Sequence, residues 1–295
     1  VIDVSPGLVA LGLPQFNQSY FFGSIFAENV CFGDTTVFTF ESDIDATSIL
    51  WDFGDGTTST DVSPSHVYNS AGNYNVIVSA ESEDGTISKS SEIIIYQPPS
   101  FNVPLTDVKI CGKEGDIIDL NQFDSYFFGS FSQNEYGIKY YETLEGAELN
   151  TLALSTDFAM ELGINRVFVK FYVLENEECS VYSDFNIVLY NNPSANAIID
   201  VNKCDDISND SIEIFNLFEN NVQIIGGQTQ NNFLVSYHLN QNDADSGENN
   251  LDSNFSNTTN PQQIFARIYN PLFEECYATT SFFIIVNQLP IINQP

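Results

Sequence analysis

Basic residues are scarce in this 295-residue chain: 8 Lys and Arg stand against 40 Asp and Glu, which gives a formal net charge of −32. Nucleic-acid phosphates and anionic lipid headgroups need basic side chains to neutralise them, so we expect no nucleic-acid partner. Long apolar runs are also lacking, because no stretch approaches the ~18 apolar residues that suggest a membrane-spanning helix. Membrane insertion is therefore not expected either.

Histidine occurs only twice, which limits acid–base and metal chemistry. His66 stands in a strand-like Pro-Ser-His-Val-Tyr segment, and His238 occupies a position that Tyr141 fills in a repeated segment, so neither is expected to act as a catalytic base. We find neither a glycine-rich phosphate loop nor a histidine-rich metal motif. We predict no catalytic residues and no enzyme activity.

Apolar residues, by contrast, are plentiful: 43% of the chain is hydrophobic and 14% is aromatic, enough for folded cores. Amphipathic helical periodicity is almost lacking, whereas short runs rich in β-branched and aromatic residues recur about every ten residues. Residues 36–40, 74–79 and 167–172 are examples. The chain is predicted to be all-β, a series of immunoglobulin-like β-sandwiches.

The most specific motif is Trp-Asp-Phe-Gly-Asp-Gly at residues 51–56, followed by Pro-Ser-His-Val-Tyr at 64–68. Trp51 can fill the centre of a sandwich core, and the two glycines supply the positive φ of a tight hairpin. The pattern resembles the PKD domain, an immunoglobulin-like sandwich. Asp52 and Asp55 are interpreted as turn-forming residues and not as a catalytic or metal pair. The structural residues of this motif are Trp51, Asp52, Gly54, Asp55, Gly56, Pro64, Tyr68, Gly72 and Tyr74.

The rest of the chain contains two copies of one pattern. Val-Phe-Val-Lys-Phe-Tyr at 167–172 matches Ile-Phe-Ala-Arg-Ile-Tyr at 264–269, and we also align Asn121 with Asn216. Prolines after each copy and before the first one mark the boundaries. The predicted division is a leader from an upstream domain, for which a β-propeller is the candidate (1–22), the PKD domain (23–97), a first immunoglobulin-like repeat (98–193), a second repeat (194–290) and a linker (291–295).

The five cysteines follow the repeats. Cys111 and Cys179 bracket the first copy, and Cys204 and Cys276 bracket the second. We predict the disulfides Cys111–Cys179 and Cys204–Cys276, each stabilising its sandwich by ~4 kcal/mol, and hence an oxidising compartment. A zinc site is the alternative, which the wide spacing disfavours. For Cys31 two interpretations remain, a buried inert thiol or a bond to an upstream domain.

A PKD domain followed by repeats of the form Cys-Asp-Asp…Phe…Val-Ser-Tyr…Ile-Phe-Ala-Arg-Ile…Cys, as at 204–276, resembles the large surface proteins of gliding bacteria. Those proteins carry a gliding-motility-associated (type B) sorting domain for type IX secretion. The segment 11–16 is similar to the one that follows their upstream β-propeller. The resemblance implies a secreted protein of the bacterial cell surface, whose partners are the secretion machinery and the neighbouring domains of the same polypeptide. The first repeat departs from the pattern at Gly112 and Lys113, where an acidic pair is expected.

Carboxylates make calcium the one cofactor to consider, because calcium binds several oxygen ligands that lie close together. The alternative is a set of solvated acidic loops without a metal, and no other cofactor is expected. The candidate ligands are Asp205, Asp206, Asp210, Asp243 and Asp245.

Two functions from different classes remain. The preferred one is a non-catalytic extracellular stalk or adhesion module, which spaces or presents binding domains and has surface polysaccharide or protein as its ligand. The alternative is an accessory carbohydrate- or protein-binding region of a secreted hydrolase, since PKD domains also accompany chitinases and proteases.

Overall fold

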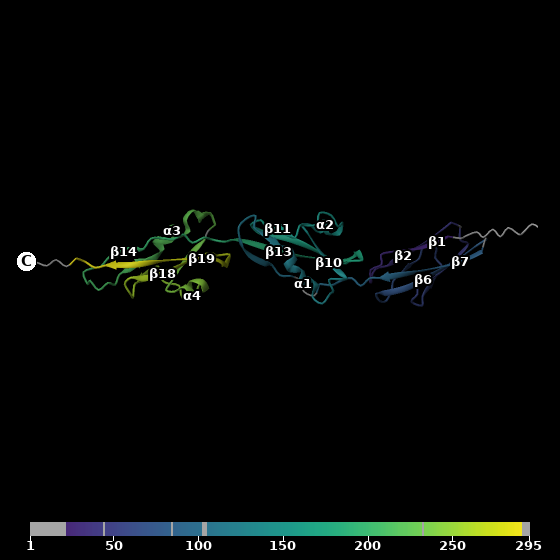
Figure 1. The fold of residues 1–295 in the computed structure, drawn as a ribbon, viewed down its shortest axis with the longest axis horizontal. Coiled ribbons are helices and arrows are strands. Elements are labelled where there is room, and N and C mark those ends of the chain that lie inside the picture. The colour runs from purple at the N-terminus through teal and green to yellow at the C-terminus, as the bar shows by residue number, and fades with distance from the viewer. Residues whose placement is uncertain (1–21, 44, 84, 102–104, 232, 291–295) are drawn as a thin grey trace, which may run out of the picture. The chain divides into compact units, whose positions relative to one another are not determined.

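The computed structural model describes residues 22–43, 45–83, 85–101, 105–231 and 233–290. Nineteen strands and seven short helical segments make up this part of the chain (Figure 1). None of its helices is long and apolar enough to cross a membrane. The chain is all-β, as predicted. Apart from Phe22, the predicted leader and the predicted C-terminal linker lie outside the described residues.

The chain forms two compact units. The first holds the chain up to Ser100 together with Phe131–Gly137 and Tyr172–Val181, and the second holds Phe101–Ser130, Ile138–Phe171 and the residues from Tyr182 onward. Three hydrophobic cores lie within the three predicted sandwich ranges. The domain boundaries themselves stay predictions.

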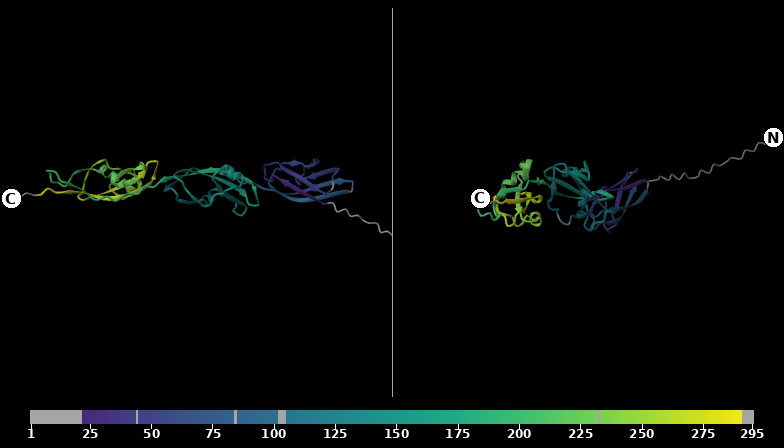
Figure 2. Two further views of the ribbon diagram at one scale, coloured as in Figure 1. Left: turned by 90° about the horizontal axis from the view of Figure 1, so that it is seen from above. Right: turned by 60° about the vertical axis from the view of Figure 1, so that its left-hand side comes forward.

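The first sandwich consists of a three-stranded sheet, β1-β2-β5, and a four-stranded sheet, β4-β3-β6-β7. Phe38 from the first sheet and Trp51 from the second are fully buried in the shared core. These strands are coloured purple to blue in Figure 2. Their bounds are β1 (Gly23–Glu28), β2 (Thr36–Ser42), β3 (Ser48–Asp52), β4 (Thr58–Ser59), β5 (Ser65–His66), β6 (Gly72–Ser82) and β7 (Gly85–Ile95).

The second sandwich has one large sheet, β10-β12-β13-β8, in which β8 runs parallel to β13. Its core lies between this sheet, the small β9–β11 pair and a helical turn, and it includes Val169, Ile187 and Phe127. The bounds are β8 (Val108–Gly112), β9 (Ile117–Asp119), η1 (Leu120–Phe123), α1 (Asp124–Phe128), β10 (Tyr136–Tyr141), α2 (Leu144–Glu148), β11 (Asp157–Ala159), β12 (Gly163–Val173) and β13 (Asn176–Asn191).

The third sandwich repeats this arrangement. Its large sheet has the order β16-β18-β19-β14, again with a parallel edge strand, and β15 pairs with β17. Its buried core includes Ile264, Ala266 and Ile284. The bounds are β14 (Val201–Cys204), β15 (Ile214–Asn216), η2 (Leu217–Asn220), α3 (Asn221–Ile225), η3 (Gly226–Asn231), β16 (Leu234–His238), α4 (Gln241–Ser246), β17 (Asn254–Ser256), β18 (Gln262–Asn270) and β19 (Phe273–Asn287).

One hydrogen bond fixes how the two repeats align. The Tyr140 hydroxyl donates to Oδ1 of Asp124, and the Tyr237 hydroxyl donates to Oδ1 of Asn221, both at 2.7 Å. The same offset pairs β9 with β15, so Asn216 corresponds to Asp119. The alignment of Asn216 with Asn121 was wrong by two residues, because a short Asn-x-Phe match in a loop is less specific than strand register.

Candidate functional site

Three residues of the PKD motif, Trp51, Tyr68 and Tyr74, pack in or against the first core. Trp51 is fully buried and meets Phe38 with ring centroids 5.7 Å apart. Its indole Nε1 has no hydrogen-bond partner among the described residues, so its contribution is apolar. Gly54 has φ +80°, and a Cβ there would lie 2.8 Å from the Asn75 carbonyl oxygen. Only glycine fits this turn without displacing the backbone.

The acidic residues of the motif are bound within their own turns. Oδ1 of Asp52 accepts the N–H of Gly54 at 2.9 Å, and Oδ1 of Asp55 accepts the N–H of Thr57 at 3.0 Å. Burial opposes ionisation of Asp55, but hydrogen bonds from Thr57 and His66 outweigh it and lower the pKa of this carboxyl. Both side chains thus organise the hairpin, the role expected from the sequence.

His66 is held by the same hairpin. Its Nε2 lies 2.7 Å from Oδ2 of Asp55, and its ring stacks on Phe53 with centroids 4.3 Å apart. The neighbouring Tyr68 donates its hydroxyl to the Phe53 carbonyl at 3.1 Å, and Tyr74 packs 4.0 Å from the Tyr68 ring. The polar groups of Asp55, His66 and Tyr68 are therefore engaged in hydrogen bonds and aromatic contacts within the hairpin.

The disulfides differ from the prediction. Cys31 bonds to Cys179, Cys111 bonds to Cys276, and Cys204 is free and exposed. The predicted pairs Cys111–Cys179 and Cys204–Cys276 are wrong, and so are both interpretations of Cys31, the inert thiol and the bond to an upstream domain. Each bond instead runs from an early cysteine of one sandwich to the late cysteine of the next.

Strand register explains why a bond inside one repeat cannot form. Cys111 lies beside Tyr190 in the β8–β13 pair, whereas Cys179 lies eleven residues earlier on the same strand β13. At ~3.3 Å per residue this separates the two cysteines by about 36 Å. Disulfides require Cα atoms within about 7 Å. The two cysteines of a repeat therefore lie at opposite ends of the sandwich.

The first junction lies within the first compact unit. Cys31 forms a parallel β-bridge with Tyr96, and its Cα lies 5.3 Å from that of Cys179. The Tyr136 hydroxyl donates to the Gln97 carbonyl at 3.3 Å. The disulfide thus joins the end of the first sheet to the β12–β13 hairpin of the next sandwich.

The second junction has the same construction and lies within the second unit. Cys111 and Cys276 have Cα atoms 5.3 Å apart. Tyr190 packs against Phe273 with ring centroids 5.2 Å apart, and Nδ2 of Asn270 donates to the Asn191 carbonyl at 3.2 Å. A covalent bond, an aromatic contact and a hydrogen bond therefore act together at this junction.

Cys204 occupies the position of Cys111 in the third sandwich. Cys111 pairs with Tyr190, and Cys204 pairs with Asn287, in parallel strand pairs of the same register. Tyr190 and Asn287 each lie eleven residues beyond the late cysteine of their repeat. The exposed thiol therefore lies where Cys111 makes its bond to the following sandwich.

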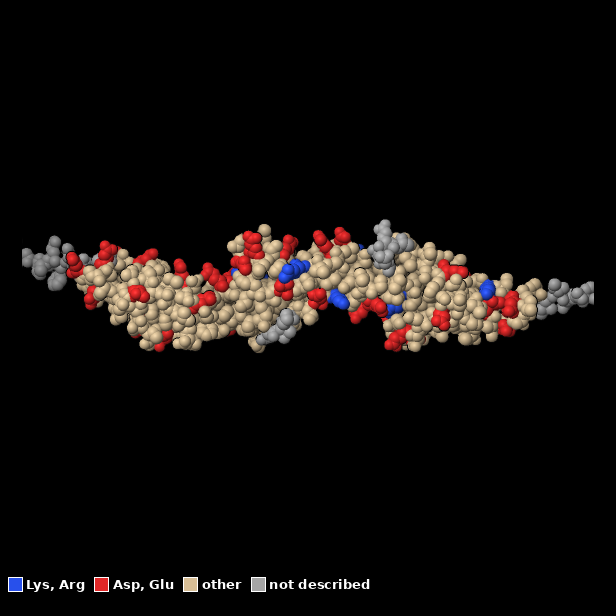
Figure 3. Space-filling view, turned by 180° about the vertical axis from the view of Figure 1, so that it is seen from behind, with Lys and Arg blue, Asp and Glu red and all other residues tan. Residues whose placement is uncertain are grey.

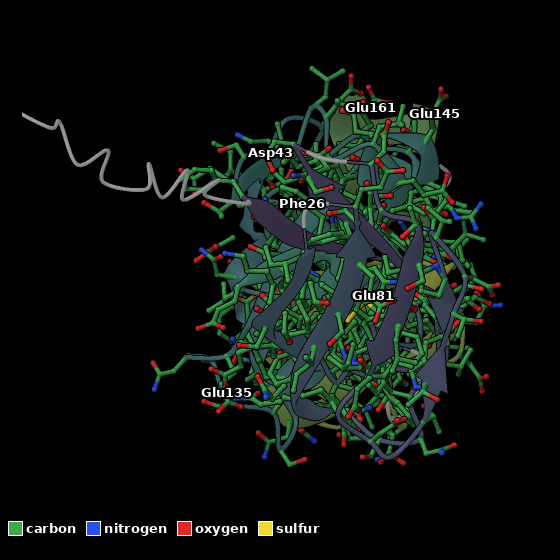
Figure 4. The ribbon with its side chains drawn as sticks, turned by 90° about the vertical axis from the view of Figure 1, so that its right-hand side faces the viewer. Phe26, Asp43, Glu81, Glu135, Glu145 and Glu161 are labelled. Carbon is green, nitrogen blue, oxygen red and sulfur yellow. A yellow bond between two sulfur atoms is a disulfide. The ribbon has the colours of Figure 1, made fainter. Side chains whose placement is uncertain are left out.

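Carboxylates greatly outnumber cations on the surface, as the face in Figure 3 shows. The side chains of Glu145 and Glu161 point away from the ribbon into solvent (Figure 4). Among the five predicted calcium ligands, only Asp205 and Asp206 lie together, and they are joined by Glu213, which the sequence analysis missed. Asp210, Asp243 and Asp245 are not part of this group; they accept hydrogen bonds from Ile212, Asn240 and Gln241.

A buried cation of the third sandwich was also missed. The Arg267 guanidinium donates to the carbonyls of Ala244 and Asp245 at the end of α4, and to the Glu274 carbonyl at 2.6 Å. It also lies over the Tyr277 ring, 4.0 Å from its centroid. The equivalent Lys170 is buried too. In a chain with 8 basic residues, a cation within an apolar strand of both repeats is a signal that sequence reasoning could use.

His238 lies fully buried in the same region. Its Nδ1 is 2.7 Å from the Glu248 carbonyl and its Nε2 is 2.9 Å from the Ser236 hydroxyl. Burial is the largest influence and lowers the pKa of His238 below its usual value. The neutral imidazole is therefore part of the folded state.

The stability of the protein should consequently fall in mild acid because of His238. The unfolded chain takes up a proton near pH 6.5 while the folded chain resists it, so acidification favours unfolding by at most about 1.4 kcal/mol per pH unit. Urea unfolding at pH 7.5 and 5.5 should show a smaller loss for His238→Gln than for the unmodified chain. Identical pH dependence of the free energy of unfolding in the unmodified chain and in His238→Gln would contradict the assignment.

Comparison with known proteins identifies two modules. Residues 25–95 match the PKD domain, and residues 200–290 match the Flavobacterium inter-domain disulphide bond domain. The second description agrees with the Cys111–Cys276 bond between sandwiches.

The curated relatives share only the PKD region with this chain. Collagenase ColA of Bacillus cereus is 33% identical over 96 residues, covering 31% of this chain and 10% of the collagenase. A microbial collagenase of Vibrio alginolyticus is 36% identical over 67 residues, covering 21% of this chain and 8% of the collagenase. The chain thus spans about a tenth of the length of these relatives.

Similar solved structures include the PKD1 domain of the Vibrio cholerae metalloprotease PrtV, at 27% identity and a TM-score of 0.22. The match covers 25% of this chain and 93% of that domain. The titin I-band fragment I67–I69 is 11% identical with a TM-score of 0.39, covering 90% of this chain and 98% of the fragment. Together with the two disulfides, the match of residues 25–95 to the PKD domain family indicates a secreted protein, since cytosolic thiols stay reduced.

Proposed function

We propose that this chain is a non-catalytic spacer of a bacterial cell-surface protein, in which each sandwich is fastened to the next by a disulfide. The observation that carries the proposal is the pair of bonds Cys31–Cys179 and Cys111–Cys276. A cross-link between consecutive modules holds their order and limits their separation, which suits a part that carries binding domains away from a surface. Type IX secretion and a role in gliding or adhesion belong to this proposal.

Cys204 is expected to form a third bond of the same kind. Its register equals that of Cys111, so we expect it to bond to the late cysteine of a further sandwich in the intact polypeptide. The partner of Cys204 is then another domain of the same polypeptide. The export machinery is the partner of the whole polypeptide during secretion.

A second candidate is an accessory region of a secreted hydrolase. The PKD similarity to two collagenases favours it. In that case the module would contact the polymer that the enzyme degrades.

Two measurements on the intact organism and the purified chain separate these functions. For a surface spacer, antibodies against the chain should label intact cells, and mild protease treatment should release the labelled fragment. The purified chain should not cosediment with insoluble collagen, chitin or cellulose. Saturable cosedimentation, together with antigen found only in the medium, would overturn the spacer and favour the hydrolase accessory.

A further inference from the structure

The connection after Cys204 distinguishes the third sandwich from the second. β14 ends at Cys204 and β15 begins at Ile214, whereas in the second sandwich the corresponding residues are Cys111 and Ile117. The third sandwich thus has a longer loop at this end. The loop is tied to the end of the domain, because the Leu289 N–H donates to Oδ1 of Asn209 at 2.9 Å.

Three carboxylates meet at this loop. One oxygen each of Asp205, Asp206 and Glu213 lies within 4.8 Å of the others. Asp206 is exposed to solvent, whereas Asp205 is buried. In a chain with 40 Asp and Glu, three neighbouring carboxylates do not by themselves indicate a metal site.

Asp205 provides the independent observation. Its side chain is almost completely buried, with 4% exposure. Oδ2 accepts the Ser211 N–H at 2.7 Å, but Oδ1 is buried without any hydrogen-bond partner among the described residues. A buried carboxylate oxygen without a partner costs free energy that a cation would recover.

Lys203 neutralises only one part of the cluster. Its Nζ lies 2.7 Å from Oε2 of Glu213 and donates to the Ile214 carbonyl at 2.9 Å. Three carboxylates against one ammonium leave the cluster with a net negative charge. A second, more compact cation would balance it.

We propose that Asp205, Asp206 and Glu213 bind a calcium ion, with Oδ1 of Asp205 as the buried ligand. Calcium takes 6–8 oxygen ligands in flexible geometry, so water and loop carbonyls can complete the shell, whereas magnesium demands a near-ideal octahedron. The exposed side of Asp206 gives the ion access from solvent. Bound calcium would order the loop that directly follows the free thiol of Cys204.

Isothermal titration calorimetry of chelator-treated protein with calcium chloride tests the site. The buffer contains ~150 mM sodium chloride, because this salt screens the diffuse attraction of calcium to a polyanion. We expect saturable binding of one ion and at least tenfold weaker binding of magnesium. Asp205→Asn should weaken calcium binding at least tenfold. Asp210→Asn, in the same loop but outside the cluster, should leave it unchanged.

Lys203→Gln keeps the test decisive if Asp205→Asn fails to fold. Removing the competing ammonium should tighten calcium binding several-fold, whereas Glu213→Gln should weaken it at least tenfold. The proposal is overturned if the unmodified chain shows no saturable binding, or if Asp205→Asn and Asp210→Asn bind equally well. Unchanged affinity in both Lys203→Gln and Glu213→Gln would overturn it as well.

Discussion

Replacing Arg267 by alanine should lower the free energy of unfolding of the third sandwich by about 3–5 kcal/mol. The guanidinium satisfies the carbonyls of Ala244, Asp245 and Glu274 in a site with 5% exposure. Alanine would leave these carbonyls without their donor and would open a cavity beside Tyr277. Urea unfolding followed by far-UV circular dichroism measures the loss.

The control for this prediction is Arg166→Ala. Arg166 lies 2.8 Å from Asp184, but its side chain is 59% exposed, so its loss should change stability far less than the loss of Arg267 does. Arg267→Lys should fall between the two variants, because an ammonium cannot reproduce the planar fork of donors. A loss below about 1 kcal/mol for Arg267→Ala would show that water or a shifted backbone replaces the arginine.

Opening the first disulfide should destabilise the first sandwich by up to about 5 kcal/mol, the value that the chain-entropy model gives for a loop of this length. The bond closes a separation of 148 residues. Trp51 is the single tryptophan and lies in the core of this sandwich, so its fluorescence reports the relevant unfolding transition. The double variant Cys31→Ser/Cys179→Ser should shift this transition to lower urea concentration.

The matched control is Cys111→Ser/Cys276→Ser, which removes a bond of the other compact unit. This variant should leave the tryptophan transition in place while lowering the stability seen by circular dichroism. Thiol titration should find one free thiol, that of Cys204, in the denatured unmodified chain and in either double-serine variant, because each variant lacks both partners of one bond. Equal tryptophan shifts in both variants would contradict the assignment of the bonds.

Short sequence patterns predicted the strands and turns well, because the conformation of a turn depends on the residues within it. The hairpin at Gly54 depends on positive φ and on turn bonds from Asp52 and Asp55, which neighbouring residues determine. The two repeats are recognisable in the sequence because Tyr140 and Tyr237 occupy equivalent positions in their cores and make equivalent hydrogen bonds. Such features can be read from a few consecutive residues.

The disulfides could not be derived in that way. Strand patterns predict that Cys111 and Cys179 lie in one sandwich, but they do not say which end of the sandwich each occupies. Only the parallel register of β8 with β13 separates them. Glu213 was missed for a similar reason, since the loop that brings it to Asp205 bends back over several residues. Pairing across a sheet is non-local information.

The two disulfides overlap along the chain, and this changes the path that a pulling force would take. Between Cys31 and Cys276 the backbone counts 245 residues, but the shortest covalent route crosses the first bond, returns from Cys179 to Cys111, and crosses the second. That route contains 68 residues of backbone, counted from 111 to 179. At ~3.4 Å per residue, the fully extended length between Cys31 and Cys276 is about 230 Å along this route, instead of about 830 Å along the backbone without the disulfides. Tension would run through the second sandwich from its C-terminal side to its N-terminal side, opposite to the direction of the chain, and the first and third sandwiches would be largely bypassed.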